Sequence, residues 1–139
     1  MRSPMMRSKS SVMIAAFSLV VSAGLSLAHH SFMAEFDQKK PFTVTGTVTK
    51  VEWMNPHAFF YLDVKDEAGR VVKWSFQTAT PSALTRRGWK RESVKAGDQV
   101  TVQGYLAKHG TNFAAARSVL LPDGHKVFTG TMDDGGPEQ

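Results

Sequence analysis

Two adjacent histidines and a Trp-Met-Asn-Pro-His segment are the parts of this sequence best suited to bind a metal. If an export signal is removed after Ala28, the new terminal residue offers its α-amine, with a pKa of about 8, and its imidazole in one chelate. Two nitrogens from one residue suit Cu(II), whereas a thioether suits Cu(I). The alternative is that these histidines only point into water. The candidate copper ligands are His29, His30, His57 and Met54.

An aromatic face is the second candidate site. Alternation along one predicted strand places Phe59 and Tyr61 opposite the core-facing residues, and Trp53 lies just before that strand. Such a face predicts binding of a peptide, a sugar or another exported protein, because exposed aromatic patches need a partner or a cover. The alternative is that an N-terminal arm carrying Phe32 and Phe36 covers the face as a second small core.

A basic segment is the third candidate. It could dock an anionic partner or a membrane surface. Alternatively, it is a solvated helix face whose charges complement the negative end of the helix dipole. Its cations are Arg86, Arg87, Lys90, Arg91 and Lys95, with Glu92 as the acid among them.

Catalytic motifs are missing from the sequence. The chain has 0 cysteines, which excludes disulfides, zinc fingers, iron-sulfur clusters and thiol nucleophiles. It also lacks Gly-x-Ser-x-Gly, a Walker loop and His-Glu-x-x-His. A terminal histidine site could activate oxygen, as in copper monooxygenases, but a domain of this size offers no extended substrate platform. We therefore expect a binding protein and not an enzyme.

The first 28 residues have the three parts of a secretory signal peptide: early positive charges, an apolar run over residues 12–23, and small residues before Ala28. The run is too short and too rich in serine for a membrane span. We expect a periplasmic or secreted protein with no span after processing. The processed chain would carry 14 Lys and Arg against 12 Asp and Glu, net +2, which argues against nucleic acid as a partner.

Hydrophobic alternation predicts a mainly β domain. In the first strand, apolar positions shift from the parity of Val44 and Val48 to that of Val51, which predicts a bulge near Thr49 or Lys50. In the second strand, the predicted core face begins at Ala58. Strands are expected over residues 42–53, 57–65, 71–77, 99–107, 113–121 and 126–128.

A short helix is expected over residues 81–87, with Thr80 as its N-cap and Gly88 after its end. Three strands, a helix and then two strands is the order of the OB-fold, a five-stranded Greek-key barrel. A small open sandwich or another β-barrel is the alternative. The expected organisation is a signal peptide (1–28), an N-terminal arm (29–41), an OB-like barrel of five to six strands (42–130) and a flexible tail (131–139).

Three segments, residues 29–32, 46–57 and 84–91, together resemble a family of small exported bacterial proteins of unknown function. The resemblance covers nearly the whole processed chain and implies export and a small β-barrel. More distantly, Trp53, Met54 and His57 are similar to the site of OB-fold periplasmic copper and silver chaperones, which implies copper as a ligand. Those chaperones use two methionines, whereas a second strand-borne methionine is absent here.

Overall fold

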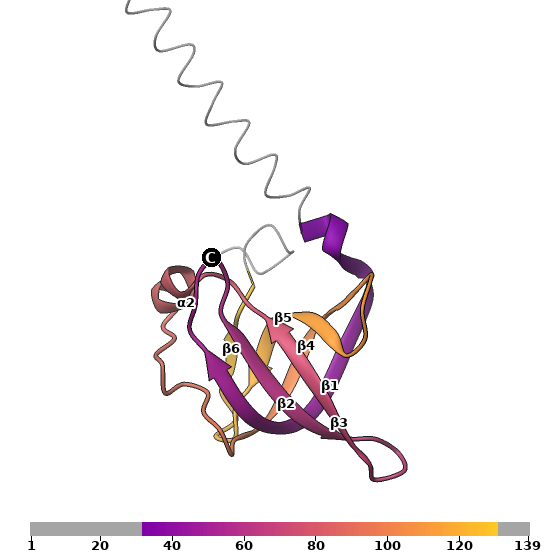
Figure 1. Cartoon of the computed structure of the whole chain (residues 1–139). Coiled ribbons are helices and arrows are strands. Elements are labelled where there is room, and N and C mark those ends of the chain that lie inside the picture. Colours follow the sequence, from indigo (N-terminus) through magenta and orange to yellow (C-terminus); the bar gives the residue numbers. More distant parts are fainter. Residues whose placement is uncertain (1–31, 131–139) are drawn as a thin grey trace, which may run out of the picture.

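The computed structural model describes residues 32–130, which form a small β-barrel (Figure 1). A helical turn at residues 32–35 precedes the first strand, and helix α2 (Pro81–Arg86) lies between the third and fourth strands. The strands are β1 (Phe36–Glu52), β2 (Phe59–Lys65), β3 (Val71–Gln77), β4 (Gln99–Ala107), β5 (Phe113–Leu120) and β6 (Lys126–Phe128).

Closure of the barrel comes from one short parallel pairing. The strands are hydrogen-bonded in the order β3-β2-β1-β4-β5-β6, and β3 also pairs with β5 between Ser75–Gln77 and Phe113–Ala115. Strands β1 to β5 therefore form a ring, and β6 extends the sheet beside β5. This topology, with one helix between β3 and β4, confirms the predicted OB-like barrel.

Strand β1 carries the predicted bulge. Its register against β2 shifts between Val48 and Lys50, so Thr49 is the additional residue. Val48 is buried on one side of the shift and Val51 is half-buried on the other, as the change of parity requires. The predicted start of this strand at residue 42 is wrong, however, because β1 already begins at Phe36.

The early start of β1 results from contacts that are distant in sequence. Phe36 is buried, pairs with Ala107 of β4, and packs edge-on against Phe113 at a centroid distance of 5.3 Å. Much of the predicted arm over residues 29–41 is therefore strand. No local alternation marks these residues, because their partners lie about 70 positions further along the chain.

The barrel core is apolar and is closed by aromatic stacking. Phe60 and Phe76 stack at 5.1 Å, and Trp74 stacks on Phe42 at 4.5 Å. The predicted inward face of β2 is confirmed, since Phe60 and Leu62 are almost fully buried. Within residues 32–130, no helix is long and apolar enough to cross a membrane.

Helix α2 has the predicted ends. The side chain of Thr80 accepts a hydrogen bond from the backbone N–H of Ala83 at 3.2 Å, and Pro81 occupies the first turn. Gly88, which follows the C-cap Arg87, has a φ of 87°. Glycine adopts this left-handed conformation without the steric cost that a Cβ brings.

Thr80→Ala is expected to lower the free energy of unfolding by about 1 kcal/mol, because one N–H of the first helical turn loses its acceptor. Urea denaturation of the variant measures this change. Thr85→Ala in the same helix serves as the control, since its hydroxyl only donates back to the Pro81 carbonyl. An equal loss in both variants would contradict a capping role for Thr80.

Candidate functional site

His57 is held in a defined orientation by a backbone carbonyl. Its Nδ1 lies 2.9 Å from the carbonyl oxygen of Thr78. A carbonyl oxygen only accepts, so Nδ1 carries the proton, and Nε2 of the neutral ring keeps a free lone pair. This arrangement is the one that metal-binding histidines commonly use, because the bond fixes both the tautomer and the direction of the ring.

The segment around His57 is anchored on both sides of the ring. The backbone N–H of Ala58 donates to the carbonyl of Ala79 at 3.2 Å, and that of Thr78 donates to the carbonyl of Ala58 at 2.9 Å. These bonds tie the chain before β2 to the chain after β3. They also explain why β2 begins at Phe59, whereas alternation predicted a start at residue 57.

A small pocket lies beside the His57 ring. Phe32 of the N-terminal arm lines it together with His57, Thr78 and Ala115. Its volume is about 30 Å³, which is room for about one water molecule and not for an organic ligand. Phe32 packs against Phe36 at 5.1 Å, and this contact holds the arm next to His57.

Of the other predicted copper ligands, the structure describes Met54 alone. Met54 lies in the same loop as His57, between β1 and β2, and its side chain is 49% exposed. His29 and His30 lie outside the described residues. Among residues 32–130, no group of three or more His, Asp and Glu side chains is positioned to hold a metal ion.

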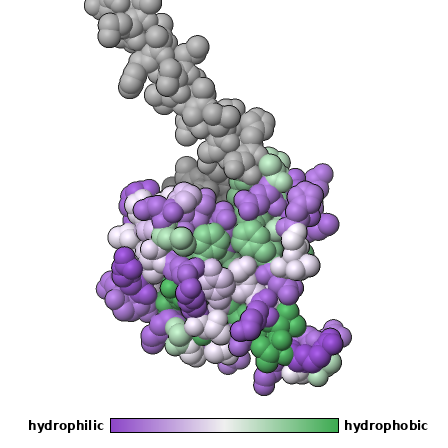
Figure 2. All heavy atoms as spheres, in the orientation of Figure 1, coloured by the Kyte–Doolittle hydropathy of each residue, from purple (hydrophilic) through white to green (hydrophobic). Residues whose placement is uncertain are grey.

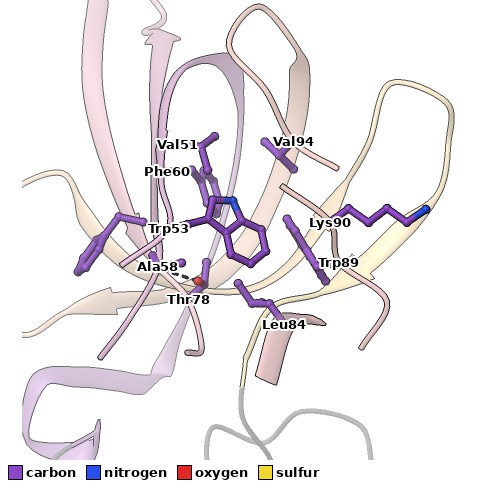
Figure 3. A pocket seen from close by; sticks show the side chains of 10 residues that line it. Val51, Trp53, Ala58, Phe60, Thr78, Leu84, Trp89, Lys90 and Val94 are labelled. Carbon is purple, nitrogen blue, oxygen red and sulfur yellow. Dashed lines mark hydrogen bonds between the residues drawn. The ribbon is translucent and has the colours of Figure 1, made fainter. Parts of the chain in front are cut away.

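Trp53 and Tyr61, predicted to share one aromatic face, line different cavities. Trp53 points into an apolar pocket, toward Leu84 and Trp89 (Figure 3). Phe59 also lines this pocket, whose volume of about 10 Å³ leaves space for one water at most. The pocket is therefore a narrow gap in the packing between the loop before β2 and helix α2.

Tyr61 instead faces an open groove with a volume of about 380 Å³. We call this cavity the Tyr61 groove; it is lined by Thr49, Tyr61, Lys73, Trp74, Thr111 and Asn112, among others. The described part of the arm does not line it, since Phe32 lies at the His57 pocket and Phe36 packs on Phe113. The arm therefore lies beside His57 and leaves the Tyr61 side of β2 uncovered by its described residues.

The Tyr61 hydroxyl is fixed by a carboxylate. It donates to Oε2 of Glu52 at 2.7 Å, and Lys50 pairs with the same carboxylate while its Nζ lies 5.7 Å from the centroid of the tyrosine ring. Hydrogen bonds from Lys50 and Tyr61 hold the pKa of Glu52 below its usual range. The hydrogen bond to Glu52 in turn raises the pKa of Tyr61. Glu52 is therefore ionised and Tyr61 protonated at neutral pH.

The basic segment surrounds the end of helix α2. Arg86 occupies the last turn, where its charge complements the helix dipole. Arg91 covers the Trp53 ring, with its Cζ 5.7 Å from the ring centroid, and Lys90 lines the apolar pocket. Lys95 pairs with Asp98 at 3.3 Å. Lys90 and Arg91 therefore both lie at the pocket that Trp53 lines, whereas Lys95 is held by Asp98.

Apolar side chains on the visible surface form small separate patches between hydrophilic residues (Figure 2). The sequence did not predict the Tyr61 groove, because its residues come from three strands and the loop before β5. Nor did any local signal predict the bond between His57 and Thr78, which are 21 residues apart.

Comparisons with known proteins give one family and two distant structures. A family model described as "Family of unknown function (DUF6152)" matches residues 16–116. No curated protein matches the chain. The mitochondrial single-stranded DNA binding protein Rim1 of S. cerevisiae is 10% identical, with a TM-score of 0.47, over 60% of this chain and 93% of that one. The N-terminal domain of PriB from Thermoanaerobacter tencongensis is 18% identical, with a TM-score of 0.41, over 60% and 96%.

Proposed function

This chain belongs to the DUF6152 family, and we propose that it is an exported, non-enzymatic module that binds Cu(II) through the His29 terminus and His57. The observation that carries the proposal is the state of His57. Its Nδ1 donates to the Thr78 carbonyl at 2.9 Å, so Nε2 is free to bind a metal, and the ring lines a pocket shared with Phe32.

Chain length allows the two ligands to meet. His29 precedes Phe32 by three residues, and three extended residues span at most about 11 Å. Since Phe32 lines the His57 pocket, an amino terminus at His29 would be tethered to that pocket by three residues. The α-amine and imidazole of His29 would supply two nitrogens and His57 a third, with His30 as an alternative imidazole.

Met54 gives the same site a softer ligand. It lies three residues before His57, and its side chain is half exposed to solvent. Thioether sulfur binds Cu(I) better than Cu(II), so Met54 would contribute after reduction of the metal. The pocket at His57 has room for about one water, which favours metal binding over turnover of an organic substrate.

Export is the second part of this function. The signal-like residues 1–28 would direct the chain to the periplasm or the medium, and cleavage after Ala28 would create the chelating terminus. A cut one residue earlier would place the amine and the imidazole on different residues, whereas a cut one residue later would leave His30 with the same chelate. The ligand set at the terminus thus depends on where the signal is cut.

His57→Ala is expected to weaken Cu(II) binding by the processed protein about 10- to 100-fold, because one of three nitrogens is lost while the His29 chelate remains. Calorimetric titration measures the affinity. His125→Ala is the matched control, since the His125 side chain is exposed and pairs with Asp123. Unchanged affinity in the His57 variant, with a folded barrel, would exclude His57 as a ligand.

Partner or glycan binding at Tyr61 is the alternative function. The Tyr61 groove favours it, because a cavity of about 380 Å³ falls in the size range of small-molecule sites. The two functions use different residues, so they can be separated experimentally. His57→Ala should weaken metal binding and leave a ligand at Tyr61 unaffected.

A further inference from the structure

The Tyr61 groove is built by two irregularities of the barrel. The bulge at Thr49 shifts β1 against β2, and β3 is paired with β5 only from Ser75 onward. At this point the backbone N–H of Ser75 donates to the carbonyl of Asn112 at 3.0 Å, and Asn112 has a φ of 55°. The start of β3 and the loop before β5 therefore diverge, and the groove opens between them.

The lining combines the Tyr61 ring with neutral hydrogen-bonding groups. Tyr61 pairs with Ser75 on the outer face of β2 and β3, whereas Trp74 pairs with buried Leu62 and packs its ring on Phe42 and Phe76 on the opposite face. Ser75, Thr111 and Asn112 contribute two hydroxyls and a carboxamide, each of which can donate and accept. A ligand that matches this lining needs an apolar face together with several hydroxyl groups at its edge.

Charges at the groove cancel one another. Lys50 pairs with Glu52, and Nζ of Lys73 lies 3.9 Å from Oδ1 of Asp63. Each lining lysine is thus paired with an acid outside the lining, so the groove does not favour a polyanion. A nucleic-acid strand would need an excess of cations along its backbone, and a protein partner would need a much larger contact area than one groove.

We propose that the Tyr61 groove binds a neutral oligosaccharide, a proposal that rests on the alternative function and is independent of copper. The C–H face of a pyranose ring lies against the Tyr61 ring, because this ring offers an apolar face beside polar groups. The sugar hydroxyls exchange hydrogen bonds with Asn112, Thr111 and Ser75. A volume of about 380 Å³ accommodates one or two sugar rings.

Titration of the processed protein with maltotetraose, cellotetraose and chitotetraose, followed by NMR and tryptophan fluorescence, tests this site. At least one is expected to bind saturably, with an affinity that 0.5 M NaCl does not change, because no net charge is involved. Tyr61→Ala is expected to weaken binding at least tenfold. Asn112→Gly should also weaken it, and glycine accepts the positive φ at this position, so the loop keeps its shape.

Two variants serve as controls. Tyr105→Ala removes a tyrosine whose hydroxyl accepts from Arg117 elsewhere on the barrel, and it should not change sugar affinity. His57→Ala should also leave it intact, which separates a failure of this site from a failure of the copper site. Absence of saturable binding by all three sugars, or equal binding by Tyr61→Ala, would overturn the inference. Binding only of the acidic sugar tetragalacturonate, abolished by salt, would overturn it as well.

Discussion

Cu(II) binding is expected to weaken at least about 100-fold when three additional residues, Ser26 to Ala28, are retained before His29. The retained residues separate the α-amine from the imidazoles of both His29 and His30, so the two-nitrogen chelate of a terminal histidine is lost while every side chain of the protein remains. Calorimetric titration of Cu(II) into both forms measures the difference. Intact mass must first confirm that the processed form begins at His29.

The same titration distinguishes the proposed site from adventitious binding. Tight 1:1 binding by the processed form alone would establish the amine and imidazole as ligands. Replacing both His29 and His30 with alanine should lower the affinity similarly, since the double variant keeps the free amine but loses both rings. Equal, weak binding by the processed and extended forms would refute copper binding at the terminus and leave the Tyr61 groove as the site to examine.

Gly104→Ala is expected to destabilise the barrel by roughly 3 kcal/mol or more. A Cβ at this position would lie 1.9 Å from the carbonyl oxygen of Ala115 and 3.1 Å from the Cα of Ala116. Both are backbone atoms of β5, so no side-chain rotation can relieve the overlap. The β4–β5 pairing, whose register already shifts between Gln103 and Gly104, would have to open.

Urea denaturation compares this variant with Gly110→Ala as the matched control. Gly110 has a φ of 94°, and a Cβ at this position would meet no atom within 4 Å beyond its chain neighbours. Its substitution therefore adds backbone strain of about 1 kcal/mol without a collision. The loss at Gly104 should be clearly larger. Comparable losses in the two variants would show that β5 moves aside at little cost.

Most of the strands were predictable, because the alternation of apolar and polar residues along a strand indicates which of its side chains are buried. Strands β3 and β4 have the predicted bounds, and the bulge at Thr49 was visible as a change of parity within β1. The ends of α2 were also predictable, since Thr80 and Gly88 act on neighbouring backbone groups. The start of β1 at Phe36 was not, because it depends on Phe113 and Ala107.

The candidate sites were predictable only as residue types. The sequence identified His57 and Tyr61 as candidates, but it combined Tyr61 with Trp53 on one face. The structure separates them, since Trp53 lines an apolar pocket and Tyr61 faces the open groove. The bulge in β1 and the loop before β2 lie between the two residues, so alternation cannot be carried from one to the other.

The sequence by itself determined which side chains of the predicted strands face the core, where the helix begins and ends, and which residue types are suited to bind a metal. Only the tertiary structure decided that His57 donates to Thr78, that Phe32 lies beside it, and that Tyr61 opens onto a groove. The physical reason is the distance along the sequence between the interacting residues. Alternation and capping depend on neighbours within about four residues, whereas sites depend on strand register and barrel closure, which join residues far apart in the chain.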